Sequence, residues 1–170
     1  ALHEDAIIVD HTTASVTLAK NLSTTCDEKN IGFIDAPISG GQSGAEQGTL
    51  SIMCGGHDHH FAKAQPVMES YGKTITHIGP SGSGQFTKMV NQILCAGAIQ
   101  GAAEAIAFGL KADLDMDNVL NAVKNGAAGS WYLQNRGETM INDEFDFGFA
   151  VDWMHKDLNL VINQAEHISA

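Results

Sequence analysis

The stretch Ser83–Lys111, with the sequence SGQFTKMVNQILCAGAIQGAAEAIAFGLK, decides how the chain is organised, because it holds no proline and is apolar almost all round. At about 1.5 Å per residue, a helix of this length extends about 40 Å. A helix that is apolar on every side is expected to be buried. Gly97 and Gly101 lie one turn apart, where they permit close approach of another helix. The stretch therefore predicts one long, buried helix.

The residues before this helix alternate between strand-like and helix-like patterns. The expected strands are residues 6–10, 32–37, 49–54 and 73–78, and the expected helices are residues 15–30 and 58–71, with a glycine-rich loop at residues 39–48. Strands that alternate with helices indicate an α/β layer with parallel pairing, at least in part.

The turn cluster at residues 79–82, Gly-Pro-Ser-Gly, separates this layer from a part that is helical throughout. Further helical patterns follow at residues 117–124, 130–140 and 151–168. We therefore predict two segments, an α/β segment over residues 1–81 and an all-α segment over residues 82–170.

The composition indicates which cellular compartment to expect and which classes of partner to exclude. The chain is 44% hydrophobic and 17% charged, which is typical of globular proteins. Its formal net charge of −11 argues against binding to nucleic acid. No apolar run approaches the roughly 20 residues that cross a bilayer, so we expect no membrane partner. The three cysteines, Cys26, Cys54 and Cys95, are odd in number and favour a reducing compartment such as the cytoplasm.

Lys88, Asn91 and Gln92 are the strongest candidates for chemistry. Their spacing of i, i+3 and i+4 places all three on one face near the start of the long helix. Burial and the positive end of the helix dipole would both favour the neutral form of the lysine, which suits a general acid/base for a hydroxyl or carbonyl. The alternative is a surface lysine whose stem lies along the helix, beside two capping amides.

The run Asp35–Gly41, DAPISGG, is a second candidate because a strand there opens into Ser39, Gly40 and Gly41. Glycines leave backbone N–H groups uncovered, and a turn lined with such groups suits a carboxylate or a phosphate. The alternative is a flexible surface loop, which is the common role of glycine-rich segments.

Three further patterns are weaker. Thr13 follows the first strand, where ligands of α/β sheets bind, but it could equally begin the next helix. Lys156 and Asp157 lie in a helical segment, where an ordinary exposed charge pair is the alternative. Three histidines cluster within residues 57–60, but no further Cys or acidic cluster completes a metal site, so we expect no metal.

Four motifs in this order resemble the β-hydroxyacid dehydrogenase family, which includes 3-hydroxyisobutyrate dehydrogenase. They are DAPISGG (35–41), GTLSIMCGG (48–56), GSGQFTKMVNQ (82–92) and HKDLNL (155–160). The resemblance implies the C-terminal part of a Rossmann-type NAD(P)-binding domain, a long interdomain helix, and then a helical domain that usually supports dimers or tetramers.

The resemblance also implies a role for each candidate residue. Lys88 corresponds to the catalytic lysine, which exchanges the proton of the substrate hydroxyl. The implied substrate-binding residues are Ser39, Gly40, Gly41, Asn91, Gln92 and Trp131. The implied cofactor-binding residues are Thr13, Lys156 and Asp157.

These roles together describe an oxidoreductase that transfers a hydride between NAD or NADP and a short β-hydroxy acid or its semialdehyde. The glycine-rich G-x-G-x-x-G loop that seats the pyrophosphate is expected upstream of Ala1, so we expect a chain of this extent to bind cofactor poorly and to be inactive. Among enzymes, 6-phosphogluconate dehydrogenase is the nearest competitor, but it shows His-Asn where this chain has Asn91-Gln92. From another class, the alternative is a non-catalytic helical association module.

Overall fold

The computed structural model describes residues 2–3 and 5–170, and the chain forms two compact units. The first unit comprises residues 1–92 and 148–170, and the second comprises residues 93–147. The long helix α4 (Ser83–Lys111) contributes its first turns to the first unit and the rest to the second. The two units differ in which residues contact one another, and their limits do not test the predicted boundary between residues 81 and 82, which stays a prediction.

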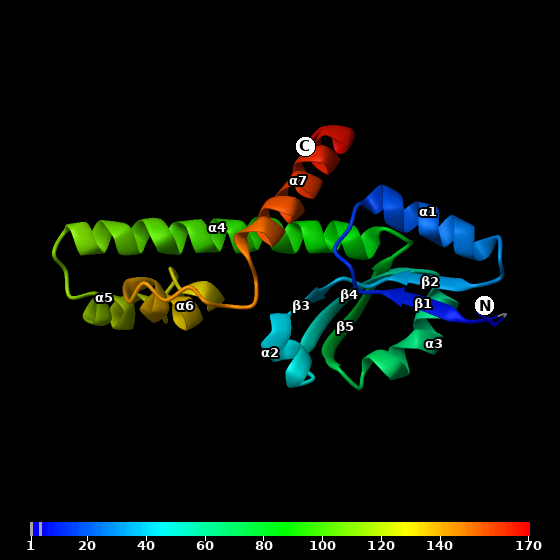
Figure 1. The fold of residues 1–170 in the computed structure, drawn as a ribbon, viewed down its shortest axis with the longest axis horizontal. Helices are drawn as coiled ribbons and strands as arrows, with labels where there is room; N and C mark the ends of the chain where they lie inside the picture. The colour runs from blue at the N-terminus through cyan, green and yellow to red at the C-terminus, as the bar shows by residue number, and fades with distance from the viewer. Residues whose placement is uncertain (1, 4) are drawn as a thin grey trace. The chain divides into compact units, whose positions relative to one another are not determined.

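A mixed sheet of five strands forms the first unit (Figure 1). The strands are β1 (Ile7–Asp10), β2 (Gly32–Asp35), β3 (Ile38–Ser39), β4 (Leu50–Gly56) and β5 (Gly72–Gly79). β1 pairs with β2, and β4 with β5, in parallel. β2 and β3 both pair with β4 in antiparallel orientation. The expected α/β layer with partly parallel pairing is therefore confirmed.

The strand predicted at residues 32–37 is interrupted at Pro37, so that β2 ends at Asp35 and β3 begins at Ile38. Proline has no backbone N–H and cannot donate to a ladder. The carbonyl oxygen of Pro37 still accepts from the Met53 N–H at 3.0 Å, which keeps the chain beside β4 across the break.

Four helices belong wholly to the first unit. They are α1 (Val16–Asp27), α2 (Gly41–Glu46), α3 (Asp58–Met68) and α7 (Val151–Ile168). The short helix α2 falls where the sequence predicts only a loop, so that prediction is wrong there. Gly40 and Gly41 adopt φ values of 129° and 60°, a backbone region that favours glycine, and these two residues turn the chain into α2.

The core of the first unit lies on both faces of the sheet, because β2 is covered on each side. Phe33 packs with Ala19 and Cys26 of α1. Its neighbour Ile34 faces the other way, into a cluster completed by β4 and by Met68 of α3. Figure 1 shows α1 and α3 on opposite sides of the sheet.

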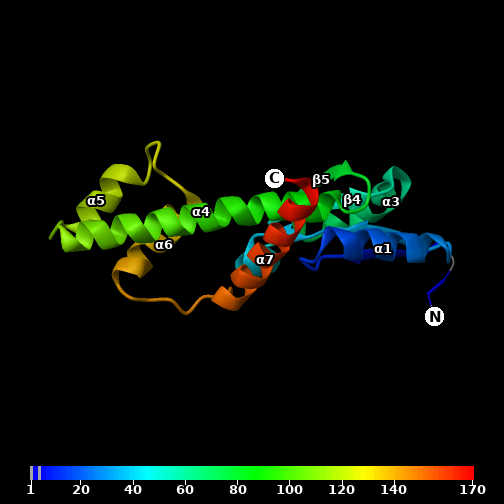
Figure 2. The same ribbon diagram turned by 90° about the horizontal axis from the view of Figure 1, so that it is seen from above.

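The second unit is helical. It consists of the later part of α4 with α5 (Met116–Val123) and α6 (Trp131–Ile141), and both figures show these two short helices beside α4 (Figures 1 and 2). Its core is small: Ala102, Leu120 and Leu133 are buried and pack together. The helical character predicted for this part of the chain is confirmed.

The expectation that α4 is buried all round is wrong for the chain described here. Leu94 is 68% exposed and Phe108 is 75% exposed, because the short helices cover only part of α4. With 29 residues, α4 is long and apolar enough to cross a membrane by length and composition. The expectation that no apolar run is long enough to cross a bilayer is therefore wrong for α4. A core helix of a soluble protein can be equally long and apolar.

Two glycines of α4 differ in what surrounds them. A Cβ atom at Gly84 would overlap the backbone oxygens of Met53 and Asp35. We expect Gly84→Ala to lower the free energy of unfolding by about 1–3 kcal/mol, because backbone atoms must move to accept it. A Cβ at Gly101 meets no atom of the described residues within 4 Å. Gly101→Ala should raise the free energy by about 0.5–1 kcal/mol through helix propensity.

Urea denaturation of the two variants measures this difference, and each serves as the control for the other. Equal shifts in the same direction would contradict the close packing assigned to the start of α4.

Candidate active site

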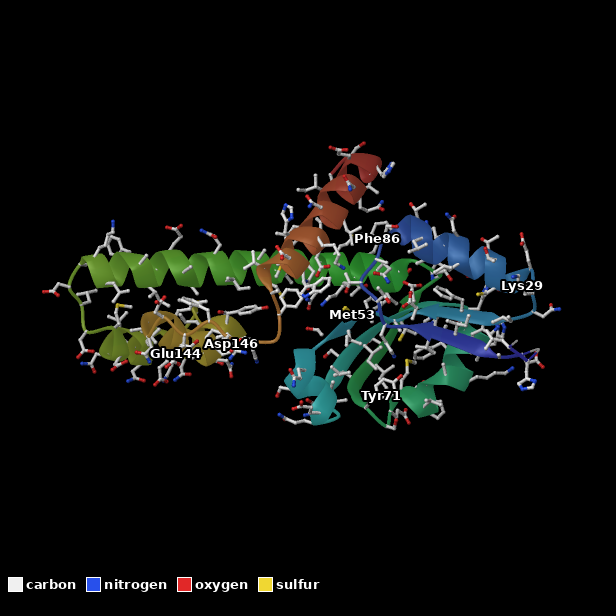
Figure 3. All side chains as sticks on the ribbon, in the orientation of Figure 1. Lys29, Met53, Tyr71, Phe86, Glu144 and Asp146 are labelled. Carbon is white, nitrogen blue, oxygen red and sulfur yellow. The ribbon has the colours of Figure 1, made fainter. Side chains whose placement is uncertain are left out.

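Asp35 joins the end of β2 to the start of α4. Its side chain is fully buried, and its two carboxylate oxygens accept the backbone N–H groups of Gly82 at 2.8 Å and Gln85 at 3.0 Å. These N–H groups lack partners within the helix, so the carboxylate satisfies them. Burial raises the pKa of Asp35, and the backbone N–H groups offset part of that rise. The first turns of α4, which carry Phe86, therefore lie against the sheet near Met53 of β4 (Figure 3).

A stripe of buried polar side chains runs along the first turns of α4. Gln85 is 1% exposed, Lys88 8% and Gln92 3%, and their spacing of i, i+3 and i+7 places them on one face of the helix. Val90 and Leu94, on the same turns, are 57% and 68% exposed. This part of α4 thus buries polar groups and exposes apolar ones, the reverse of an ordinary surface helix.

Asp157 of α7 connects two of the predicted site residues. Its Oδ2 accepts from Gln92 Nε2 at 2.8 Å, and its Oδ1 lies 2.9 Å from Lys156 Nζ. That second contact is an ion pair without hydrogen-bond geometry, and Oδ1 has no hydrogen-bond partner among the described residues. On the other side of Gln92, its Oε1 accepts from Asn91 Nδ2 at 2.7 Å. These bonds orient both side-chain amides.

The loop between β1 and α1 is bound to the same two helices. The Gln85 amide donates to Thr12 O at 2.8 Å and accepts from the Ala14 N–H at 3.0 Å. Lys156 Nζ donates to Thr13 O at 2.8 Å. Because β1 and β2 are parallel, this loop leaves the carboxyl edge of the sheet, where ligands of α/β sheets bind.

The structure therefore brings five predicted site residues into one connected network: Thr13, Asn91, Gln92, Lys156 and Asp157. Lys88 lies on the same buried face of α4. Asp157 is a predicted cofactor-binding residue, yet its carboxylate accepts a hydrogen bond from Gln92, a predicted substrate-binding residue.

The remaining predicted residues lie outside this network. Ser39 ends β3, and Gly40 and Gly41 begin α2. Trp131 belongs to the second unit, is 59% exposed, and has the Arg136 guanidinium 5.3 Å from its ring centre. Their predicted roles in holding the substrate stay predictions.

Asp35 and Gln85 were not among the predicted site residues. Gln85 stands three residues before Lys88 and seven before Gln92, and that spacing is the sequence signal that could have found it. The contact of Asp35 with Gln85 of α4 spans 50 positions and has no local signal.

The histidine cluster forms a separate feature. His57, His59 and His60 line a hollow of about 280 Å³ together with Asp27. Burial lowers the pKa of His60, with smaller contributions from His59 and His57. Within the described part of the chain, no group of three or more His, Cys, Asp or Glu side chains could hold a metal ion.

Two family models match the chain. Residues 82–170 match the NAD-binding model of NADP-dependent 3-hydroxyisobutyrate dehydrogenase, and residues 1–79 match the NAD-binding domain of 6-phosphogluconate dehydrogenase. Both models describe oxidoreductases that use a nicotinamide dinucleotide. The chain belongs to the 3-hydroxyisobutyrate dehydrogenase-like branch of the β-hydroxyacid dehydrogenase family.

Individual relatives agree with this assignment. The chain is 48% identical to an uncharacterized oxidoreductase of Shewanella frigidimarina, over 96% of this chain and 56% of that protein. It is 40% identical to 2-hydroxy-3-oxopropionate reductase of Escherichia coli, over 95% of this chain and 56% of the reductase. A crystal structure of 3-hydroxyisobutyrate dehydrogenase from Salmonella typhimurium matches with a TM-score of 0.88 and 29% identity, over 96% of this chain and 57% of that one. The chain thus spans little more than half the length of these relatives.

We expect Asp35→Asn to lower the free energy of unfolding by about 1–3 kcal/mol, because the new NH₂ group would face a backbone N–H that has no other acceptor. The matched control is Asp115→Asn at the exposed N-cap of α5, where Asp115 accepts from the Asn118 N–H at 3.2 Å. Asparagine caps an exposed helix about as well as aspartate. Urea denaturation measures both, and an equal effect at the two sites would remove the special role of the buried carboxylate.

Proposed function

We propose that the protein carrying this chain is an oxidoreductase that transfers a hydride between NAD or NADP and a short β-hydroxy acid or its semialdehyde. The observation that carries the proposal is the buried polar face of α4, where Lys88 lies between Gln85 and Gln92 in a chain of this family. Polar side chains are buried in an apolar helix only where they have partners or a task.

In this proposal Lys88 is the general acid/base. When bound, the nicotinamide accepts or supplies the hydride, and the protein must move the proton of the substrate hydroxyl. Lys88 has 8% of its surface exposed, so the residue as a whole is largely shielded from bulk water. That setting suits proton exchange with a single bound hydroxyl or carbonyl.

The neighbouring groups orient the substrate and the cofactor. Gln92 is fixed by Asp157 and Asn91, so its amide is in place before a ligand arrives. Backbone N–H groups at Ser39, Gly40 and Gly41 would hold the substrate carboxylate. Thr13, whose carbonyl is bound by Lys156, would contact the cofactor.

The substrate class follows from what the relatives share. The Escherichia coli relative is named for a reductase of 2-hydroxy-3-oxopropionate, and the Salmonella structure for a dehydrogenase of 3-hydroxyisobutyrate. Both names describe a small carboxylic acid with a reducible or oxidisable group at its third carbon. We propose a substrate of that size for this protein, with NAD or NADP as cofactor and the cytoplasm as its location.

In the full-length gene product, we expect Lys88→Ala to lower kcat about 10²- to 10⁴-fold, because a positioned acid/base contributes about that much. The KM for the cofactor should change far less. Lys111→Ala, at the exposed end of the same helix, is the control and should leave both constants unchanged. Steady-state kinetics with a panel of short hydroxy acids measures these values. Equal losses in kcat and in cofactor affinity would rule out the acid/base role.

A second candidate function, helical association, is favoured by the second unit. A hollow of about 410 Å³ on this unit is lined by apolar and small residues: Gly97, Gly101, Ala105, Ile106, Leu120 and Leu133. A Cβ at Gly97 or Gly101 meets no described atom within 4 Å, so this face of α4 is open. We propose that it packs against a second copy of the chain, in a homodimer or homotetramer.

We expect Gly101→Leu to weaken self-association by at least about tenfold in Kd, because an extra side chain would hold a partner helix away. Ala103→Leu, on an exposed position of α4 outside the hollow, is the control. Analytical ultracentrifugation measures the oligomeric state of both variants. A wild-type chain that is monomeric at all concentrations would end the association proposal.

A further inference from the structure

The loop of residues 12–14 has neither helical nor strand structure, yet side chains from distant parts of the chain hold its backbone. Thr12 O and the Ala14 N–H both bond to the Gln85 amide, at 2.8 and 3.0 Å. Thr13 O, between them, accepts from Lys156 Nζ at 2.8 Å. Three consecutive residues are thus bound through their main chain to α4 and α7.

Gln85 is well suited to fix a loop. It is 1% exposed, and its amide uses its oxygen and its nitrogen on the same loop, which determines the orientation of the side chain. Its own backbone N–H donates to Asp35 Oδ2 at 3.0 Å, at the end of β2. One residue therefore connects the carboxyl ends of β1 and β2 to the first turns of α4.

We propose that Gln85 is a positioning residue that sets the loop carrying Thr13 at a fixed distance from Lys88, one helical turn further along α4. The inference rests on the proposed function, in which Thr13 contacts the cofactor and Lys88 contacts the substrate. Hydride transfer requires the two ligands to be aligned within a fraction of an ångström. The two hydrogen bonds of the Gln85 side chain to the loop supply that alignment from the protein side.

The first test needs no enzymatic activity. In the 170-residue chain, Gln85→Met keeps the shape of the side chain and removes both hydrogen bonds. The Ala14 amide should then exchange with deuterium about tenfold faster, because its acceptor is lost. Gln85→Glu keeps an acceptor for Ala14 and should accelerate exchange less. Gln100→Met, at an exposed glutamine whose side chain donates to Glu104 Oε1 at 2.9 Å, is the matched control and should leave the exchange of Ala14 unchanged.

The second test uses the full-length gene product. Gln85→Met should raise the KM for the nicotinamide cofactor by about tenfold, because loss of a paired hydrogen bond frees the loop. The KM for the hydroxy acid should stay within about twofold, since Lys88 and Gln92 keep their contacts. Gln85→Glu should fall between wild type and Gln85→Met.

The outcomes separate this inference from the proposed function. Unchanged exchange at Ala14 in Gln85→Met would overturn the inference, and so would equal increases in both KM values, which indicate general loosening. If wild-type protein oxidises no hydroxy acid, the proposed function fails, while the exchange experiment still decides whether Gln85 holds the loop. If Gln85→Met does not fold, Gln85→Glu decides it: exchange at Ala14 faster than in wild type supports the inference, because the bond to Thr12 O is lost, and an unchanged rate overturns it.

Discussion

The buried carboxylate of Asp35 is the interaction on which the candidate site depends. A carboxylate without solvent is unfavourable, and burial raises the pKa of this one. The unpaired N–H groups at the start of α4 are also unfavourable when they are buried. The two groups stabilise each other, since the Asp35 carboxylate accepts hydrogen bonds from the N–H groups of Gly82 and Gln85. These two hydrogen bonds fix the start of α4 against the end of β2, and with it the polar stripe on the first turns of α4.

From this joint, polar contacts extend in two directions. Gln85 bonds to the loop after β1, and Gln92 bonds to Asp157 of α7. Lys88 lies between the two glutamines on the same face. The network therefore joins a helix, two strand ends and a second helix that are far apart in the sequence. Its side chains are two glutamine amides, two carboxylates and the Lys156 ammonium. Side chains held in this way have few alternative rotamers, which is the property that a site for small ligands needs.

The sequence predicted the local features well. The helix Ser83–Lys111 and the helix Val151–Ile168 lie where the sequence pattern placed them, because neither stretch holds a proline that would end a helix. The shared face of Lys88 and Gln92 also follows from helical spacing alone. The short helix α2 was missed, since six residues that begin with glycine carry almost no helical signal.

The long-range features could not be predicted in the same way. The bonds of Asp35 to Gln85 and of Gln85 to Thr12 connect residues 50 and 73 positions apart, and no periodicity encodes such a pair. The exposure of Leu94 and Phe108 was missed for a different reason. An apolar pattern predicts that a surface is covered, but it does not say whether the covering atoms belong to the same stretch of chain.

The break in the sheet at Pro37 lies beside a short chain of hydrogen bonds that connects three distant parts of the first unit. The carbonyl of Ala36, just before the break, accepts from His11 Nδ1 at 2.6 Å, and His11 Nε2 lies 2.9 Å from the Tyr71 hydroxyl. A carbonyl can only accept, so in the neutral ring Nδ1 carries the proton and Tyr71 donates to Nε2. Tyr71 is 60 residues away, at the turn before β5. The final position of the segment that follows β1 therefore depends on a side chain at the turn before β5 as well as on its neighbours in the sheet.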